Sequence, residues 1–147
     1  MRKYGVVIIA LLFLAYGGMR LGVSSLLILQ VSSLIDLEAL RGPIIEVADF
    51  MADKAPQSLV PFSAAGYLVY LWVMGLALTA GAIACLRNYR QWVPLIASFI
   101  GLYALLFLNF MTINRKFSHL IVCAVLFALL VWLKRKPQDQ AEVQPDV

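Results

Sequence analysis

Charged side chains are scarce in this 147-residue chain: only 14% of its residues are Asp, Glu, Lys or Arg, whereas 63% are hydrophobic. In soluble globular domains about a quarter of the residues are charged and about half are apolar. A chain this small cannot bury so much apolar surface in one water-facing core. The composition excludes an ordinary soluble enzyme, a disordered protein and a nucleic-acid-binding domain, and it predicts an integral membrane protein of one domain.

Residues typical of metal and redox chemistry are also few. The chain has two cysteines, Cys85 and Cys123, and one histidine, His119. The cysteines form no CxxC pair, which argues against a membrane thiol–disulfide oxidoreductase, and we expect them to be small packing residues. His119 has no second ligand at helical spacing, so we predict no metal site. The sequence offers no catalytic motif either, which favours a non-enzymatic role.

Long uncharged runs are what the sequence does contain. About 20 helical residues cross the hydrocarbon layer of a bilayer. The sequence predicts four spans, over about residues 5–30, 61–86, 92–112 and 117–133, with Pro61 and Pro94 in the first turns of the second and third. The predicted fold class is therefore all-α: an integral membrane four-helix bundle in residues 1–133, followed by a disordered cytoplasmic tail, residues 134–147.

The first run also fits a signal peptide, with Arg2 and Lys3 before an apolar stretch and Ala15-Tyr16-Gly17 as a cleavage site. We favour an uncleaved first helix, because the apolar run resumes after Arg20.

The outer loop between the first two spans, residues 36–55, predicts a short amphipathic helix. Gly42-Pro43 is typical of a helix start, and the next three turns place apolar residues on one face and acidic residues on the other. We expect this helix to lie over the outer end of the bundle, with at least one acid close to a base. The pairs that this arrangement favours are Asp49 with Arg20 and Glu46 with Arg115.

Lysine and arginine are distributed unevenly between the two sides of the predicted bundle. With the N-terminus inside, seven of them lie inside and four outside. Positive charge accumulates on the cytoplasmic side of membrane proteins. The count predicts a multi-pass protein of the cell inner membrane with both termini in the cytoplasm.

Arg20 is the one charged residue within the predicted spans. At 1.5 Å per residue from Tyr4 it lies about 24 Å along the first helix, roughly one turn below the outer boundary. An arginine there can snorkel, be paired within the protein or contact a ligand. Tyr16 and Ser24 share its helix face.

Other polar side chains gather in the predicted outer half of the bundle. This bias fits either an outward-opening pocket or ordinary polarity near an interface. The candidate ligand-binding residues are Tyr16, Arg20, Tyr67, Asn109 and His119.

Arg20-Leu21-Gly22 in the first helix and the Gly/Ala-rich run from Gly75 to Arg87 carry a resemblance to a known family. With the chain length, the four helices and the short outer helix, they resemble the DoxX-like group of small bacterial membrane proteins. The resemblance implies a four-helix membrane protein. That group often has a glutamate in its second helix, and no acidic residue stands between Pro56 and Leu86 here, which argues against a quinone-linked redox role.

The sequence favours a non-enzymatic accessory or structural subunit of a bacterial inner-membrane complex. Its partners would be the lipid bilayer and another membrane protein or a second copy, with no nucleic acid and no cofactor. One alternative is a redox component that binds quinone through Tyr16, Arg20 and His119. The other is a small oligomeric transporter or channel.

Overall fold

The computed structural model describes residues 2–111 and 117–135, and this part of the chain is helical without any strand. Four of the helices are long and apolar enough to cross a membrane, as predicted. The elements in chain order are α1 (Arg2–Val31), α2 (Glu38–Lys54), the 3-10 turn η1 (Ala55–Gln57), α3 (Ala64–Leu86), α4 (Trp92–Phe110) and α5 (Phe117–Arg135).

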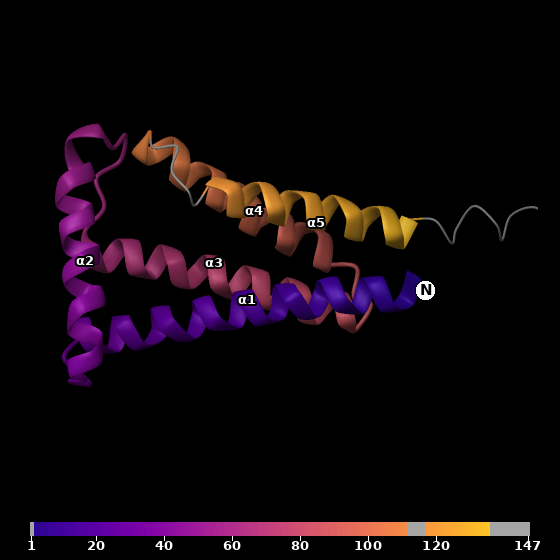
Figure 1. Cartoon of the computed structure of the whole chain (residues 1–147), viewed down its shortest axis with the longest axis horizontal. Coiled ribbons are helices and arrows are strands. Elements are labelled where there is room, and N and C mark those ends of the chain that lie inside the picture. Colours follow the sequence, from indigo (N-terminus) through magenta and orange to yellow (C-terminus); the bar gives the residue numbers. More distant parts are fainter. Residues whose placement is uncertain (1, 112–116, 136–147) are drawn as a thin grey trace, which may run out of the picture.

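The four long helices run along one axis, and α2 lies across one end of them (Figure 1). α1 and α3 lie side by side in opposite directions, and α3 also packs on α4. α5 contacts both α1 and α4. The start of α1, the α3–α4 connection and the last turn of α5 therefore lie together at the end away from α2.

The second long helix begins later than the sequence predicted. α3 starts at Ala64, and Pro61 lies in the irregular segment before it rather than in its first turn. Ser63 is the N-cap, and its Oγ accepts a hydrogen bond of 3.0 Å from the Gly66 amide. The cap satisfies an amide that the helix leaves unpaired, which fixes the start here. Pro94 does lie in the first turn of α4.

The outer helix begins earlier than predicted. α2 starts at Glu38, so Pro43 lies inside the helix and Gly42-Pro43 is not its start. A proline this close to a helix start removes only one intrahelical hydrogen bond, to the carbonyl of Ala39. Ala39 is exposed, so water can reach the residue that loses this bond.

The other helix ends differ from the predicted spans by a few residues. α1 runs slightly beyond 5–30 at both ends, and α4 ends at Phe110 because Met111 adopts a left-handed backbone with φ of 47°. Lys134 and Arg135 continue α5, which the sequence ended at 133. Thr112 and residues 136–147, most of the predicted tail, lie outside the described residues.

α3 ends in a Schellman motif built on asparagine instead of glycine. Asn88 has a φ of 57°, and its amide donates to the Cys85 carbonyl at 3.2 Å. The Tyr89 amide donates to the Ala84 carbonyl at 2.8 Å. These two bonds satisfy the last carbonyls of the helix. Ser33, with a φ of 58°, ends α1 in the same way.

Lys134 joins the end of α5 to the α3–α4 connection. Its Nζ donates to the Cys85 carbonyl and to Asn88 Oδ1, each at 3.0 Å. The same ammonium lies 5.2 Å from the centre of the Trp92 ring. Lys134 therefore ties the helices together at this end of the molecule, whereas the sequence placed it in the tail.

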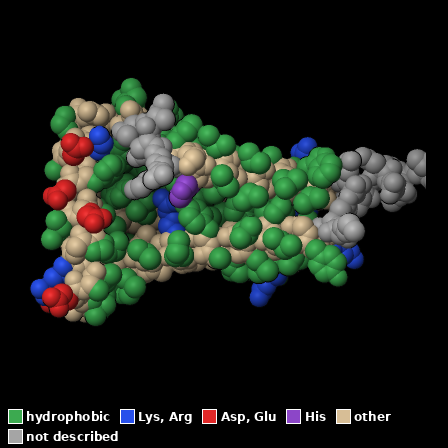
Figure 2. Space-filling view, viewed as in Figure 1, with side chains coloured by type: hydrophobic (Ala, Val, Ile, Leu, Met, Phe, Trp, Pro, Cys, Tyr) green, Lys and Arg blue, Asp and Glu red, His purple; other side chains and the backbone are tan. Residues whose placement is uncertain are grey.

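The apolar face of α2 packs on the long helices as predicted. Met51 is buried, and Val47 and Phe50 lie against a cluster that includes Tyr67 and Phe110. The acidic side chains of α2 form its outer surface (Figure 2).

The acids of α2 do not form the predicted ion pair with Arg20. Glu46 and Asp49 are exposed, and the ion pairs within the described residues are Asp36–Arg41 and Asp53–Lys54. The structure does not bring Asp49 to Arg20, because the apolar stripe turns the acids toward solvent. Arg115 lies outside the described residues, so its pairing with Glu46 stays a prediction.

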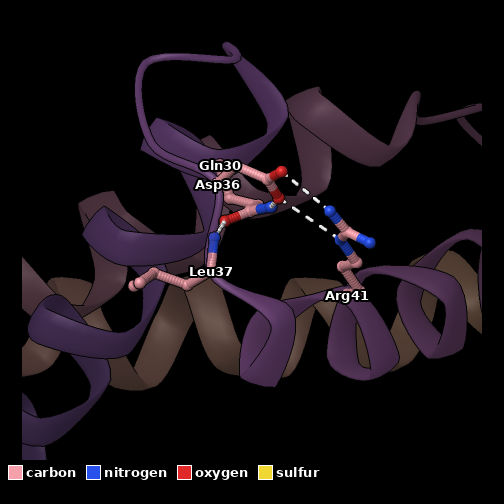
Figure 3. A network of polar contacts seen from close by, with 4 residues as sticks. All are labelled: Gln30, Asp36, Leu37 and Arg41. Carbon is pink, nitrogen blue, oxygen red and sulfur yellow. Dashed lines mark hydrogen bonds and ion pairs between the residues drawn. The ribbon is translucent and has the colours of Figure 1, made fainter.

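A polar network sets the turn between α1 and α2 (Figure 3). Arg41 donates twice to Asp36, through Nη2 at 2.7 Å and Nε at 3.2 Å. Gln30 donates to Asp36 at 3.1 Å and accepts from the Leu37 amide at 2.8 Å. Hydrogen bonds from Arg41 and then Gln30 hold the pKa of Asp36 below its ordinary value. Because Asp36 and Arg41 are exposed, this pair orients the turn more than it stabilises the fold.

α1 and α3 approach each other closely at Gly17 and Gly75. A Cβ on Gly75 would lie 2.8 Å from the Leu21 amide nitrogen, so only glycine fits there. Gly18 and Gly22 have nothing within 4 Å of such a Cβ. Gly17 and Gly75 are thus the small residues that let the two backbones meet.

We predict that Gly17→Ala destabilises the protein and that Gly18→Ala does not. The new methyl group at Gly17 would lie 2.8 Å from Thr79 Oγ1 and 2.9 Å from the Thr79 amide nitrogen. Overpacking of this kind costs about 1–3 kcal/mol. Thermal unfolding midpoints in a mild detergent measure the difference, and equal midpoints for the two variants would contradict the close packing.

Candidate functional site

Arg20 lies on α1 between two tyrosines. Its Nη1 donates to Tyr16 Oη at 3.3 Å, one turn earlier on the same helix. Its guanidinium carbon lies 4.8 Å from the centre of the Tyr103 ring on α4. The ring face attracts the cation, and the side chain is half-buried. Arg20 is therefore held between α1 and α4 and is not paired with an acid of the described chain.

Aromatic rings fix the position of Tyr103. On α4, the Phe99 and Tyr103 ring centres are 5.7 Å apart, and those of Tyr103 and Phe107 are 5.3 Å apart. Tyr16 packs edge-on against Phe99 at 6.4 Å. Side chains four residues apart on a helix are neighbours, so this row extends along one face of α4. The rings of Phe99 and Phe107 therefore hold the Tyr103 ring in place beside Arg20.

A cavity of about 400 Å³ lies beside Arg20. Figure 2 shows this face of the molecule hollowed next to α2. The polar part of the wall comes from α1, α3, α4 and α5, while Phe50 of α2 contributes to its cover. The polar lining residues are Tyr16, Arg20, Tyr67, Tyr103 and His119.

A second cavity, of about 420 Å³, adjoins the first between α1 and α5. Tyr16 and His119 line both. The remaining wall of the second cavity is apolar and consists of Leu12, Phe13, Val122, Cys123 and Leu126. A polar chamber at Arg20 thus leads into an apolar groove that points away from α2.

Four of the five predicted binding residues meet at the polar cavity: Tyr16, Arg20, Tyr67 and His119. They come from three helices, so their convergence is a property of the fold and not of local spacing. His119 is near the start of α5. That helix therefore begins about level with Arg20, while α1 continues about 16 Å further, at 1.5 Å per residue, to reach α2.

Asn109, the fifth predicted residue, does not line either cavity. Its Oδ1 accepts from the Val60 amide at 2.7 Å, and its Nδ2 donates to the Val60 carbonyl at 3.1 Å. The Leu59 amide donates to the backbone carbonyl of Asn109 at 3.0 Å. Asn109 therefore anchors the segment that leads into α3.

Other polar groups of the same region also hold helices together. Trp72 Nε1 donates to Ser25 Oγ at 3.0 Å, which joins α3 to α1. The Tyr70 hydroxyl donates to the Leu102 carbonyl at 2.7 Å, which joins α3 to α4. The polar bias seen in the sequence thus has two causes: a cavity, and hydrogen bonds between helices.

Tyr103 is a polar lining residue that the sequence did not identify, and Phe50 is one of the apolar lining residues that it did not identify. Tyr103 stands at four-residue spacing between Phe99 and Phe107, which reads as ordinary packing. Which face of α4 meets α1 is decided by tertiary contacts, and no pattern in the sequence specified it.

The lining offers binding groups more than catalytic groups. No carboxylate is among the described residues that line either cavity. No cluster of three His, Cys, Asp or Glu occurs within residues 2–111 and 117–135. Cys85 and Cys123 are both buried, and neither forms a disulfide. The site can donate hydrogen bonds, present one fixed positive charge and accept apolar surface.

No family model, no curated protein and no solved structure matches this chain.

We predict that Asn109→Ala lowers stability by about 1–3 kcal/mol, because it leaves both backbone groups of Val60 without their partner. Ser98→Ala is the control, since Ser98 is exposed and bonds only to a carbonyl of its own helix. Thermal midpoints in detergent compare the two. A midpoint for Asn109→Ala equal to that of Ser98→Ala would mean that the anchor contributes little.

Proposed function

We propose that this chain is a small, non-enzymatic integral membrane protein that binds an amphipathic molecule from the bilayer. The observation that carries the proposal is the pair of adjoining cavities, one polar at Arg20 and one apolar between α1 and α5. Phospholipids, fatty acids and quinones all belong to this class of ligand.

The sizes and walls of the cavities support this function. Ligand pockets have volumes of about 300–1,000 Å³ and are mostly apolar, with a few polar groups that fix orientation. Each cavity falls within this range. Arg20, Tyr16 and His119 supply the polar groups, and the α1–α5 groove supplies the apolar wall.

The proposed setting is a bacterial inner membrane, with both termini in the cytoplasm and α2 outside. The distribution of Lys and Arg supports this orientation. In this setting the chain would serve a larger membrane complex as an accessory subunit, beside another membrane protein or a second copy.

Filling the groove tests the proposed function. Val122→Trp places a large ring at a residue that lines the apolar cavity. Val125→Trp is the matched control, because Val125 is on the same helix, is 61% exposed and lines neither cavity. Mass spectrometry of the lipids and quinones that co-purify, per mole of protein, should show the loss of an amphiphile only in Val122→Trp. Identical inventories for both variants and the unmodified protein would overturn the proposal.

Labelling with a membrane-impermeant maleimide tests the orientation. In a variant without Cys85 and Cys123, Gln57→Cys should react in intact cells and Arg90→Cys only after the membrane is permeabilised. Both positions are exposed and lie at opposite ends of the molecule. The reverse pattern would invert the topology.

A further inference from the structure

Building on the proposed function, we infer that the ligand carries an oxyanion head group, a phosphate or carboxylate, which Arg20 binds. Its apolar chain lies in the groove between α1 and α5. This assigns a chemical class to the two ends of the ligand and a direction to its chain.

Charge complementarity identifies the head group. Arginine stays protonated under all ordinary conditions. Arg20 has no acid within ion-pair distance in the described chain, where the recorded pairs are Asp36–Arg41 and Asp53–Lys54. A positive charge among apolar side chains is costly unless a negative partner balances it. An anion entering the cavity supplies that partner.

The hydrogen-bonding capacity of Arg20 points to the same class. A guanidinium has five N–H donors in a planar fork that matches two oxygens of a carboxylate or phosphate. Within the described residues, Nη1 of Arg20 donates to Tyr16 Oη at 3.3 Å. Its guanidinium carbon also lies 4.8 Å from the centre of the Tyr103 ring. These two tyrosines together do not occupy all five donors.

The acidic residues of α2 do not supply the negative partner of Arg20. Phe50 is the α2 residue that lines the cavity, and Glu46 and Asp49 are exposed. Among the described residues, the other polar residues that line this cavity are Tyr16, Tyr67, Tyr103 and His119. These groups can add hydrogen bonds to an oxyanion, but they do not neutralise Arg20.

The shared walls place the chain of the ligand. Tyr16 and His119 line both cavities, so a head group at Arg20 has the apolar groove directly beside it. Leu12, the groove residue farthest from Arg20 on α1, lies about 12 Å away at 1.5 Å per residue. That length approaches the depth of one leaflet, about 15 Å of hydrocarbon.

A ligand panel with one common acyl chain tests the inference on the unmodified protein in detergent. Oleoyl lysophosphatidic acid and oleic acid carry oxyanions, and mono-olein carries the same chain on a neutral head. Decylubiquinone tests a quinone, and inorganic phosphate tests the head without a chain. Dissociation constants from native mass spectrometry or tryptophan fluorescence should be at least about 10-fold lower for one or both oxyanion lipids than for mono-olein, as a charge-assisted hydrogen bond predicts.

Two variants locate the binding. Arg20→Gln keeps hydrogen-bond donors and removes the charge, so it should reduce oxyanion binding to the level of mono-olein. Arg87→Gln is the control, since Arg87 is exposed and lies at the end away from α2. Val122→Trp should weaken the binding of every ligand that has the oleoyl chain. Because the panel is first measured on the unmodified protein, the inference stays testable even if Arg20→Gln does not fold.

The outcomes separate the inference from the proposed function. Mono-olein or decylubiquinone binding as tightly as the oxyanion lipids would overturn the oxyanion head group and leave amphiphile binding intact. Inorganic phosphate binding as tightly as lysophosphatidic acid would show a free anion as the ligand and overturn the chain in the groove. An Arg20→Gln variant that binds oxyanion lipids normally would overturn the role of Arg20. No binding of any ligand with a chain would overturn both proposals.

Discussion

A guanidinium on an otherwise apolar helix is the constraint around which the rest of this structure is arranged. A charge on such a helix needs partners, because apolar side chains do not stabilise it. Tyr16 supplies a hydroxyl from the same helix, and Tyr103 supplies a ring from α4. The aromatic row on α4 holds that ring in place, and Phe50 of α2 covers the same space. The cavity exists because these groups surround Arg20 without filling the volume beside it.

Neighbouring residues of α1 have two different roles, because some of them pack on α3 and others line the cavity. Gly17 and Leu21 face α3, and the two backbones approach closely at Gly17 and Gly75. Tyr16 and Arg20 stand one residue earlier in each case, about 100° around a helix of 3.6 residues per turn, and line the cavity. α1 packs tightly on α3 along one face. Its adjacent face is turned toward α5, and the apolar groove lies between these two helices.

The sequence predicted the elements of this fold well, because length and hydropathy alone determine which runs can form long apolar helices. It also singled out Arg20 and Tyr16, since a charge in an apolar run and a partner four residues away are visible locally. It placed the starts of two helices wrongly, at Pro43 and Pro61. Pro43 lies inside α2, which begins at Glu38, and the Ser63 cap starts α3 after Pro61. Tyr103 and Asn109 show the remaining limit. Their roles depend on which helix faces meet, and tertiary packing decides that.

The two ends of the molecule restrict how an amphiphile would reach the groove. At the end away from α2, Lys134 ties α5 to the α3–α4 connection, and Gly5 of α1 lies against Leu133 of α5. At the other end, Met51 and Phe50 of α2 pack into an aromatic cluster with α3 and α4. Between these ends, α1 and α5 are separated by a groove whose walls are apolar. In the proposed membrane setting, acyl chains surround that groove at the same depth, so the favoured entry is sideways between α1 and α5. A molecule arriving by that route keeps its chain in apolar surroundings throughout, and its head group meets the positive charge of Arg20 at the end of the path.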